Sequence, residues 1–88
     1  MKQNDLLHRQ FDQVSPAIRL EVAWSASIID KIDRISQEKG ITQRELARRI
    51  GCSETQISRW TRGVPNFTLN SLAKLSDALG ENLIQIPV

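Results

Sequence analysis

The side chains best suited to chemistry in this 88-residue chain gather in one short segment, residues 41–63. Its apolar residues recur three and four positions apart, as Leu46 and Ile50 do and then Ile57 and Trp60, which predicts two short helices with one buried side each. Polar side chains fall on the opposite side of the second helix, and these are Glu54, Thr55, Gln56, Ser58, Arg59 and Arg62. Such a row of hydrogen-bonding groups on an exposed helix is what reading base edges in a DNA major groove requires.

A tight turn must join the two helices if both are to pack on one core. Gly51-Cys52-Ser53 fits this place, because glycine suits the left-handed residue that follows a helix and Ser53 can cap the next helix. Small Ala47 allows the two helices to approach closely. Residues 42–63 therefore predict a helix-turn-helix.

No second cluster of residues with catalytic or metal-binding spacing occurs in the sequence. His8 has no acid or nucleophile placed to work with it, and a Gly-x-Ser-x-Gly elbow, a phosphate-binding glycine loop and paired carboxylates are all missing. Cys52 is the only cysteine, so it can form no internal disulfide and has no partner at metal-ligand spacing. We therefore expect no enzyme activity, no metal and no cofactor.

The charge is unevenly distributed, although the net charge is only +2. Residues 1–37 carry five basic and five acidic side chains, residues 38–62 carry six basic against three acidic, and the remainder has a net charge of −1. A local basic excess is usually a solvated surface. Here it coincides with the predicted helix-turn-helix, which favours contact with an anionic partner.

The elements that must position this segment are helical. Gly40, Gly51, Gly63 and Gly80 each follow a periodic apolar stretch, and Ser15, Thr42, Ser53 and Thr68 each precede one. Pro16 suits a first helical turn, so one long helix is expected over residues 16–39, with a break allowed by the Trp24-Ser25-Ala26-Ser27 run. Residues 5–13 have the spacing of a short amphipathic helix, and residues 69–79 of a last helix.

The predicted fold class is all-α, a compact bundle of four to six helices. After Gly80, Ile84 and Ile86 alternate with Gln85, a pattern that allows a short C-terminal strand. A lone strand would leave backbone groups unpaired, so its partner would be the same strand of a second subunit or the sheet edge of another protein.

Residues 41–63 resemble the helix-turn-helix of the phage repressor and Cro family, also called the xenobiotic-response-element family. The resemblance rests on Gln43, Ala47, Gly51, Ile57 and Gly63, each in register, and it extends over residues 28–80. It implies a repressor-like bundle that binds double-stranded DNA. Since one recognition helix reads few base pairs, we also expect a homodimer that presents two helices about 34 Å apart to a palindromic operator.

The resemblance also assigns roles to individual side chains. Glu54, Thr55 and Arg59 would contact bases. Glu54 would accept a hydrogen bond from cytosine, Thr55 would offer its methyl and hydroxyl groups, and Arg59 would donate to guanine. Contacts to phosphates would come from Gln43, Gln56, Ser58, Arg62, Asn66 and Thr68. Two simpler interpretations stay open: Glu54 can serve the dipole at a helix N-terminus, and Gln43 can be merely solvated.

A second resemblance concerns the two ends of the chain. Residues 15–25, 66–69 and 83–86 are similar to antitoxins of the HigA-like class. In that class the protein represses its own operon and binds a ribosome-dependent toxin that cleaves messenger RNA. This resemblance implies a transcriptional repressor that is also an antitoxin.

Three regions are predicted: residues 1–27 as a helical extension for dimer or partner contacts, residues 28–80 as the DNA-binding domain, and residues 81–88 as a tail or short strand. Trp60 is expected in the core, whereas Trp24 fits either the core or a protein partner. The sequence shows no secretory signal or membrane span, so we expect a cytoplasmic protein. Two alternatives remain: a stand-alone regulator that dimerises through its N-terminal extension, and a protein-interaction module that binds no DNA.

Overall fold

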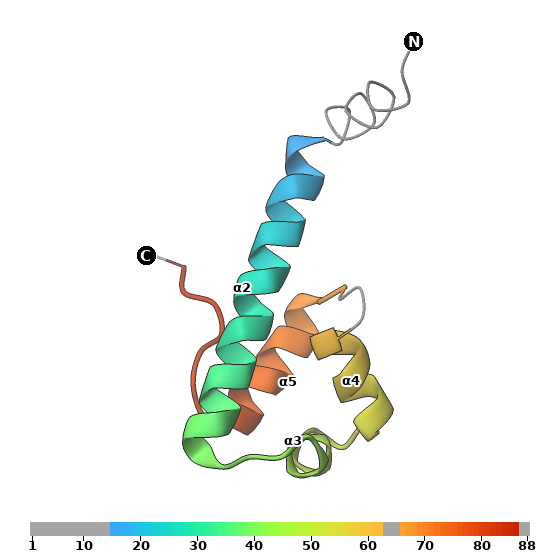
Figure 1. Cartoon of the computed structure of the whole chain (residues 1–88), viewed down its shortest axis with the longest axis vertical. Coiled ribbons are helices and arrows are strands. Elements are labelled where there is room, and N and C mark those ends of the chain that lie inside the picture. The colour runs from blue at the N-terminus through green and yellow to red at the C-terminus, as the bar shows by residue number, and fades with distance from the viewer. Residues whose placement is uncertain (1–14, 63–65, 87–88) are drawn as a thin grey trace, which may run out of the picture.

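The computed structural model describes residues 15–62 and 66–86, and this part of the chain contains four helices. They are α2 (Pro16–Lys39), α3 (Gln43–Ile50), α4 (Glu54–Arg62) and α5 (Leu69–Leu79). The predicted all-α class is confirmed (Figure 1). The helix expected over residues 5–13 and the turn glycine Gly63 lie outside the described residues.

Helix α2 begins and ends as its sequence predicts. The Ser15 side chain accepts a hydrogen bond from the Ile18 N–H at 3.2 Å, and Pro16 occupies the first turn. At the other end Gly40 has a φ of 67°, and its N–H bonds back to the carbonyls of Gln37 and Ser36. The break that the sequence allowed near residues 25–27 is absent, because two serines weaken a helix only slightly and neither glycine nor proline interrupts the run.

The core lies where the lower part of α2 meets the other three helices. Its members are buried apolar side chains from all four helices and the adjoining loops: Ile32, Ile35, Ile41, Leu46, Ala47, Ile57, Leu72, Leu75, Leu79 and Leu83. Ile28, Ile50 and Trp60 are partly buried against this cluster. The periodicity of the apolar residues thus identified the buried side of each helix correctly, and Trp60 packs on the core as predicted.

The two ends of α2 have different surroundings. In Figure 1 its first turns rise beyond the other helices, whereas its last turns lie beside α5 and level with α3. Lys39 ties the lower end in place, since its Nζ donates to the Leu79 carbonyl at 2.7 Å and lies 3.5 Å from Glu81 Oε2. The ends of α2 and α5 are therefore fixed to each other.

After α5 the chain turns at Gly80 and runs back along α2 on the side away from α4 (Figure 1). Leu83 is buried, and its N–H donates to Ser76 Oγ at 3.1 Å. Within the described residues this segment forms no strand, because nothing in a single chain lies beside it to pair with its backbone. No described helix is both long and apolar enough to cross a membrane.

Candidate nucleic-acid interface

The turn between α3 and α4 has the geometry that the sequence predicts. Gly51 has a φ of 82°, a left-handed conformation that side chains with a Cβ rarely adopt. The N–H groups of Gly51 and Cys52 both donate to the Ala47 carbonyl, at 2.8 and 3.0 Å. The chain therefore leaves α3 and enters α4 within three residues.

The first turn of α4 is held by Ser53. Its side-chain oxygen accepts from the Gln56 N–H at 3.1 Å, as its predicted capping role requires. Ile57 is completely buried and so fixes the rotation of α4 on the core. Because a helix turns about 100° per residue, the side of α4 opposite Ile57 carries Thr55, Arg59 and Arg62.

These three side chains form one exposed row, which we call the α4 row: Thr55, Arg59 and Arg62. Neither arginine makes an ion pair or a side-chain hydrogen bond with another described residue. All donors of both guanidinium groups thus remain available for a ligand, and a guanidinium can pair with guanine or phosphate through two hydrogen bonds at once.

The other predicted contact residues of α4 lie beside this row. Glu54 is exposed at the first position of the helix, where its carboxylate also suits the helix dipole, so both interpretations of Glu54 stay open. Gln56 and Ser58 are half-buried. Both side chains therefore flank the α4 row and are less exposed than its members.

The remaining predicted residues come from the starts of α3 and α5. Gln43 is half-buried in the first turn of α3, directly after Thr42, whose Oγ1 accepts from the Glu45 N–H at 3.1 Å. Asn66 and Thr68 are exposed before α5. The Thr68 hydroxyl is already engaged, since it accepts from the Ser71 N–H at 3.1 Å in a reciprocal capping box. A phosphate contact from Thr68 therefore competes with its role as a cap.

A charge cluster on α3 was missed by the sequence analysis. Glu45 accepts from Arg48 at 2.6 and 2.9 Å and from Arg49 at 3.0 Å. Hydrogen bonds from Arg48 and then from Arg49 lower the pKa of Glu45 to about 2, and the same contact with Glu45 raises the pKa of Arg48. Spacings of three and four residues on one helix were the available signal.

This cluster divides the basic segment into two parts. Arg49 also donates to the Ala78 carbonyl of α5 at 3.0 Å, so its guanidinium links α3 to α5. Arg48 and Arg49 are thus bound within the protein, whereas the two arginines of the α4 row have no such partner among the described residues. Within the basic segment, the arginines that have no ion pair among the described residues are Arg44 of α3 and the two arginines of the α4 row.

Comparisons with known proteins agree with this geometry. A family model described as helix-turn-helix matches residues 32–86, more than half of the chain. An uncharacterized HTH-type transcriptional regulator, y4dJ of Sinorhizobium fredii, is 38% identical over 53 residues, which cover 60% of this chain and 69% of that protein. No solved structure matches. The chain belongs to the helix-turn-helix family.

Proposed function

We propose that the protein is a transcriptional repressor that binds double-stranded DNA in a sequence-specific manner. The observation that carries this proposal is the α4 row, with two unpaired arginines on the side of the helix opposite buried Ile57. A B-DNA major groove is wide enough to admit one helix, and the α4 row lies on the exposed side of α4. The name of the Sinorhizobium relative points to the same class of protein.

In this proposal the side chains divide into two groups. Thr55 and Arg59 contact bases, with Glu54 at the N-terminal edge of the same surface. Phosphates are bound by polar groups around this surface, namely Gln43, Gln56, Ser58, Arg62, Asn66 and Thr68. Contacts to bases determine which sequence is bound, whereas contacts to phosphates set the affinity for every sequence.

The test compares Arg59→Ala, Arg62→Ala and Arg34→Ala on the promoter fragment located by footprinting. Arg59→Ala is expected to weaken discrimination between operator and unrelated DNA by about 1–3 kcal/mol, because a bidentate base contact is lost. Arg62→Ala should weaken binding to both DNAs and reduce the salt dependence by roughly one phosphate contact. Arg34 is an exposed arginine of α2 outside the α4 row, so its removal should change neither.

Unchanged discrimination in Arg59→Ala would contradict the proposal for α4. The absence of gel retardation on any genomic fragment at low salt would contradict DNA binding as a whole. That second result would favour the alternative from another class, a protein-interaction module built on the same scaffold.

A finer proposal concerns partners: the repressor is a homodimer on a palindromic operator and the antitoxin of a messenger-RNA-cleaving toxin. Residues 28–80 bind DNA, residues 1–27 make dimer or partner contacts, and residues 81–88 form a tail or a short strand. The supporting observation is the start of α2, where Ile18, Leu20, Val22 and Trp24 are all exposed by half or more. Apolar side chains gathered on an exposed helix mark a protein contact surface.

Co-expression with the product of the adjoining gene tests this finer proposal. A toxin should co-purify with the wild-type protein, and Leu20→Lys should abolish the complex while leaving DNA binding intact. If no adjoining product is retained, the stand-alone regulator is the better description.

A further inference from the structure

The C-terminal segment, residues 82–86, is anchored at one point and unpaired beyond it. Leu83 is only 5% exposed and donates to Ser76, but no backbone N–H of residues 84–86 donates a hydrogen bond within the described part of the chain. Ile86 is 74% exposed. A row of free backbone groups flanked by isoleucines is a surface for pairing with another strand.

A groove lies between this segment and α5. It has a volume of about 740 Å³, and its walls include Leu69, Leu72, Ala73 and Ser76 on one side and Ile84 on the other. Leu69 is 75% exposed. The groove has a polar part as well, lined at the end of α5 and in the turn after it by Asp77, Glu81 and Asn82. The apolar part lies beside the free edge of the segment.

We propose that a second copy of this chain covers the groove, and that the two C-terminal segments pair as antiparallel strands across a two-fold axis near Gln85. This pairing places Ile84 opposite Ile86 of the second copy, twice, and cross-strand pairs of β-branched side chains stabilise such a sheet. Gln85 meets its own copy, and an amide can both donate and accept. A two-fold interface needs this kind of self-complementary surface.

Exposed apolar side chains supply more than half of the apolar area that such a dimer needs. An interface of standard size buries about 800 Å² per partner, of which roughly 60%, or about 500 Å², is apolar. Leu69, Ile84 and Ile86, at roughly 100 Å² each, supply about 300 Å² of this area. Trp24 borders the same region, because a smaller pocket lined by Trp24, Phe67 and Leu72 shares Leu72 with the groove.

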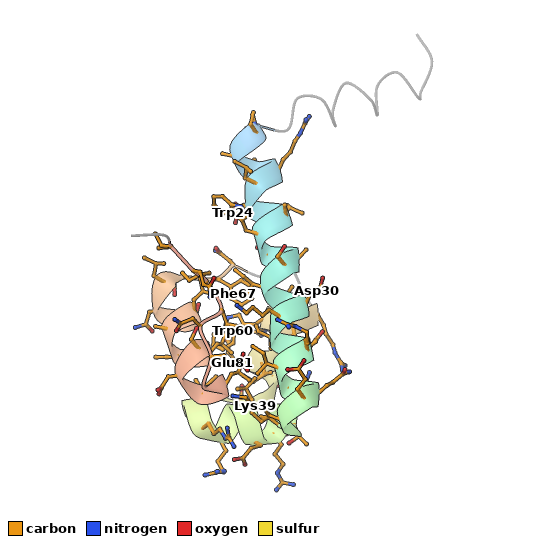
Figure 2. All side chains as sticks on the ribbon, turned by 90° about the vertical axis from the view of Figure 1, so that its left-hand side faces the viewer. Trp24, Asp30, Lys39, Trp60, Phe67 and Glu81 are labelled. Carbon is orange, nitrogen blue, oxygen red and sulfur yellow. The ribbon has the colours of Figure 1, made fainter. Side chains whose placement is uncertain are left out.

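The figures place this surface where it leaves the DNA-binding helix free. In Figure 1 the C-terminal segment and α4 lie on opposite sides of α2. In Figure 2 Trp24 points from α2 toward the side on which α5 and the segment lie. A dimer formed through the segment therefore keeps both copies of α4 at its outside. The inference rests on the proposed function for its purpose, since it supplies the two recognition helices of a palindrome reader.

The test is sedimentation equilibrium of the full chain at micromolar concentration without DNA. The wild type should sediment as a dimer, and Ile86→Lys should raise the dissociation constant by about 100-fold or more, because each subunit would bury an unpaired charge. Gln85→Pro removes a backbone donor but no apolar surface, and it should also weaken the dimer. Ala26→Lys adds the same charge on an exposed part of α2 and should leave the dimer unchanged.

A wild-type monomer would overturn the proposal, and so would a dimer that survives both Ile86→Lys and Gln85→Pro. Loss of the dimer in Ala26→Lys would assign the contact to α2. Circular dichroism checks that each variant folds. Because no DNA is present, the outcome is independent of the proposed function, whose failure would instead be seen with Arg59→Ala in the DNA assay.

Discussion

The two halves of α2 show that apolar content and burial need not agree. The projecting half, residues 16–27, has seven apolar and two charged residues, yet every residue except Ser25 is exposed. The packed half, residues 28–39, has four isoleucines and six charged residues, and it contributes Ile32 and Ile35 to the core. Burial in this chain follows the spacing of apolar residues and the presence of neighbouring helices.

The projecting half lacks the pattern that would give it one buried side. Ile18 and Val22 lie on one flank of the helix and Leu20 and Trp24 on another, since each pair is four residues apart and the pairs are offset by two. A helix that is apolar on several sides is normally covered by other chains or segments. The match to the helix-turn-helix family begins only at Ile32, so this half lies outside the region that defines the family.

Truncating one side chain in each half should give the largest contrast. Ile32→Ala is expected to lower the free energy of unfolding by about 2–4 kcal/mol, because Ile32 is 1% exposed and its loss leaves a cavity. Val22→Ala should change it by less than about 0.5 kcal/mol, because Val22 is largely exposed. Urea unfolding followed by circular dichroism measures both. Equal losses would mean that the projecting half is packed in solution.

Removing a helix cap should have a smaller effect on stability, and one that differs between the projecting start of α2 and a helix packed on the core. Ser15→Ala is expected to weaken the first turn of α2 by about 1 kcal/mol, seen as faster hydrogen exchange there, with the global unfolding midpoint unchanged. Thr42→Ala removes the equivalent cap of α3, which is packed on the core, so it should lower global stability by a similar amount. A global effect of Ser15→Ala would show that α2 unfolds as one cooperative unit.

The smallest effect on the free energy of unfolding should come from α3, where Glu45 forms exposed ion pairs with Arg48 and Arg49. The pKa of Glu45 falls from 4.5 to about 2 on folding, so the carboxylate contributes its stabilisation fully above pH 4.5 and loses it as the pH falls toward 2. The difference in stability between wild type and Glu45→Gln should therefore be constant above pH 4.5 and vanish near pH 2. Unfolding curves across this range measure it, and high salt should reduce it because the pairs are exposed. A difference that persists near pH 2 would contradict this assignment.

Local signals in the sequence predicted most of the fold. Glycine at three described helix ends and Ser15, Thr42, Ser53 and Thr68 at the starts fixed the boundaries, because capping depends on residues within one turn. The continuity of α2 past Ser25 was harder to predict, because alanine favours a helix there while the neighbouring serines weakly disfavour it. The exposure of Trp24 could not be predicted, because it depends on whether another helix of the fold extends far enough along α2 to cover this side chain.

The candidate site was predicted less completely. The buried position of Ile57 followed from periodicity, and with it the exposure of Arg59 and Arg62. Charge counting along the chain placed Arg48 and Arg49 in the same basic excess, although Glu45 binds both. The tie from Arg49 to Ala78 joins residues 29 positions apart, and no spacing rule reports such a contact. The engagement of the Thr68 hydroxyl by Ser71 was visible only once α5 was placed.

The uninterrupted course of α2 makes it a rigid spacer. Its 24 residues span about 36 Å, since each residue of an α-helix advances the chain by 1.5 Å. Its lower end is fixed by Ile32, Ile35 and Lys39, so a molecule bound near Pro16 is held at a set height and rotation above the rest of the fold. Adding or removing two residues near Ser27 would turn that molecule by about 200° around the helix axis and leave the core untouched.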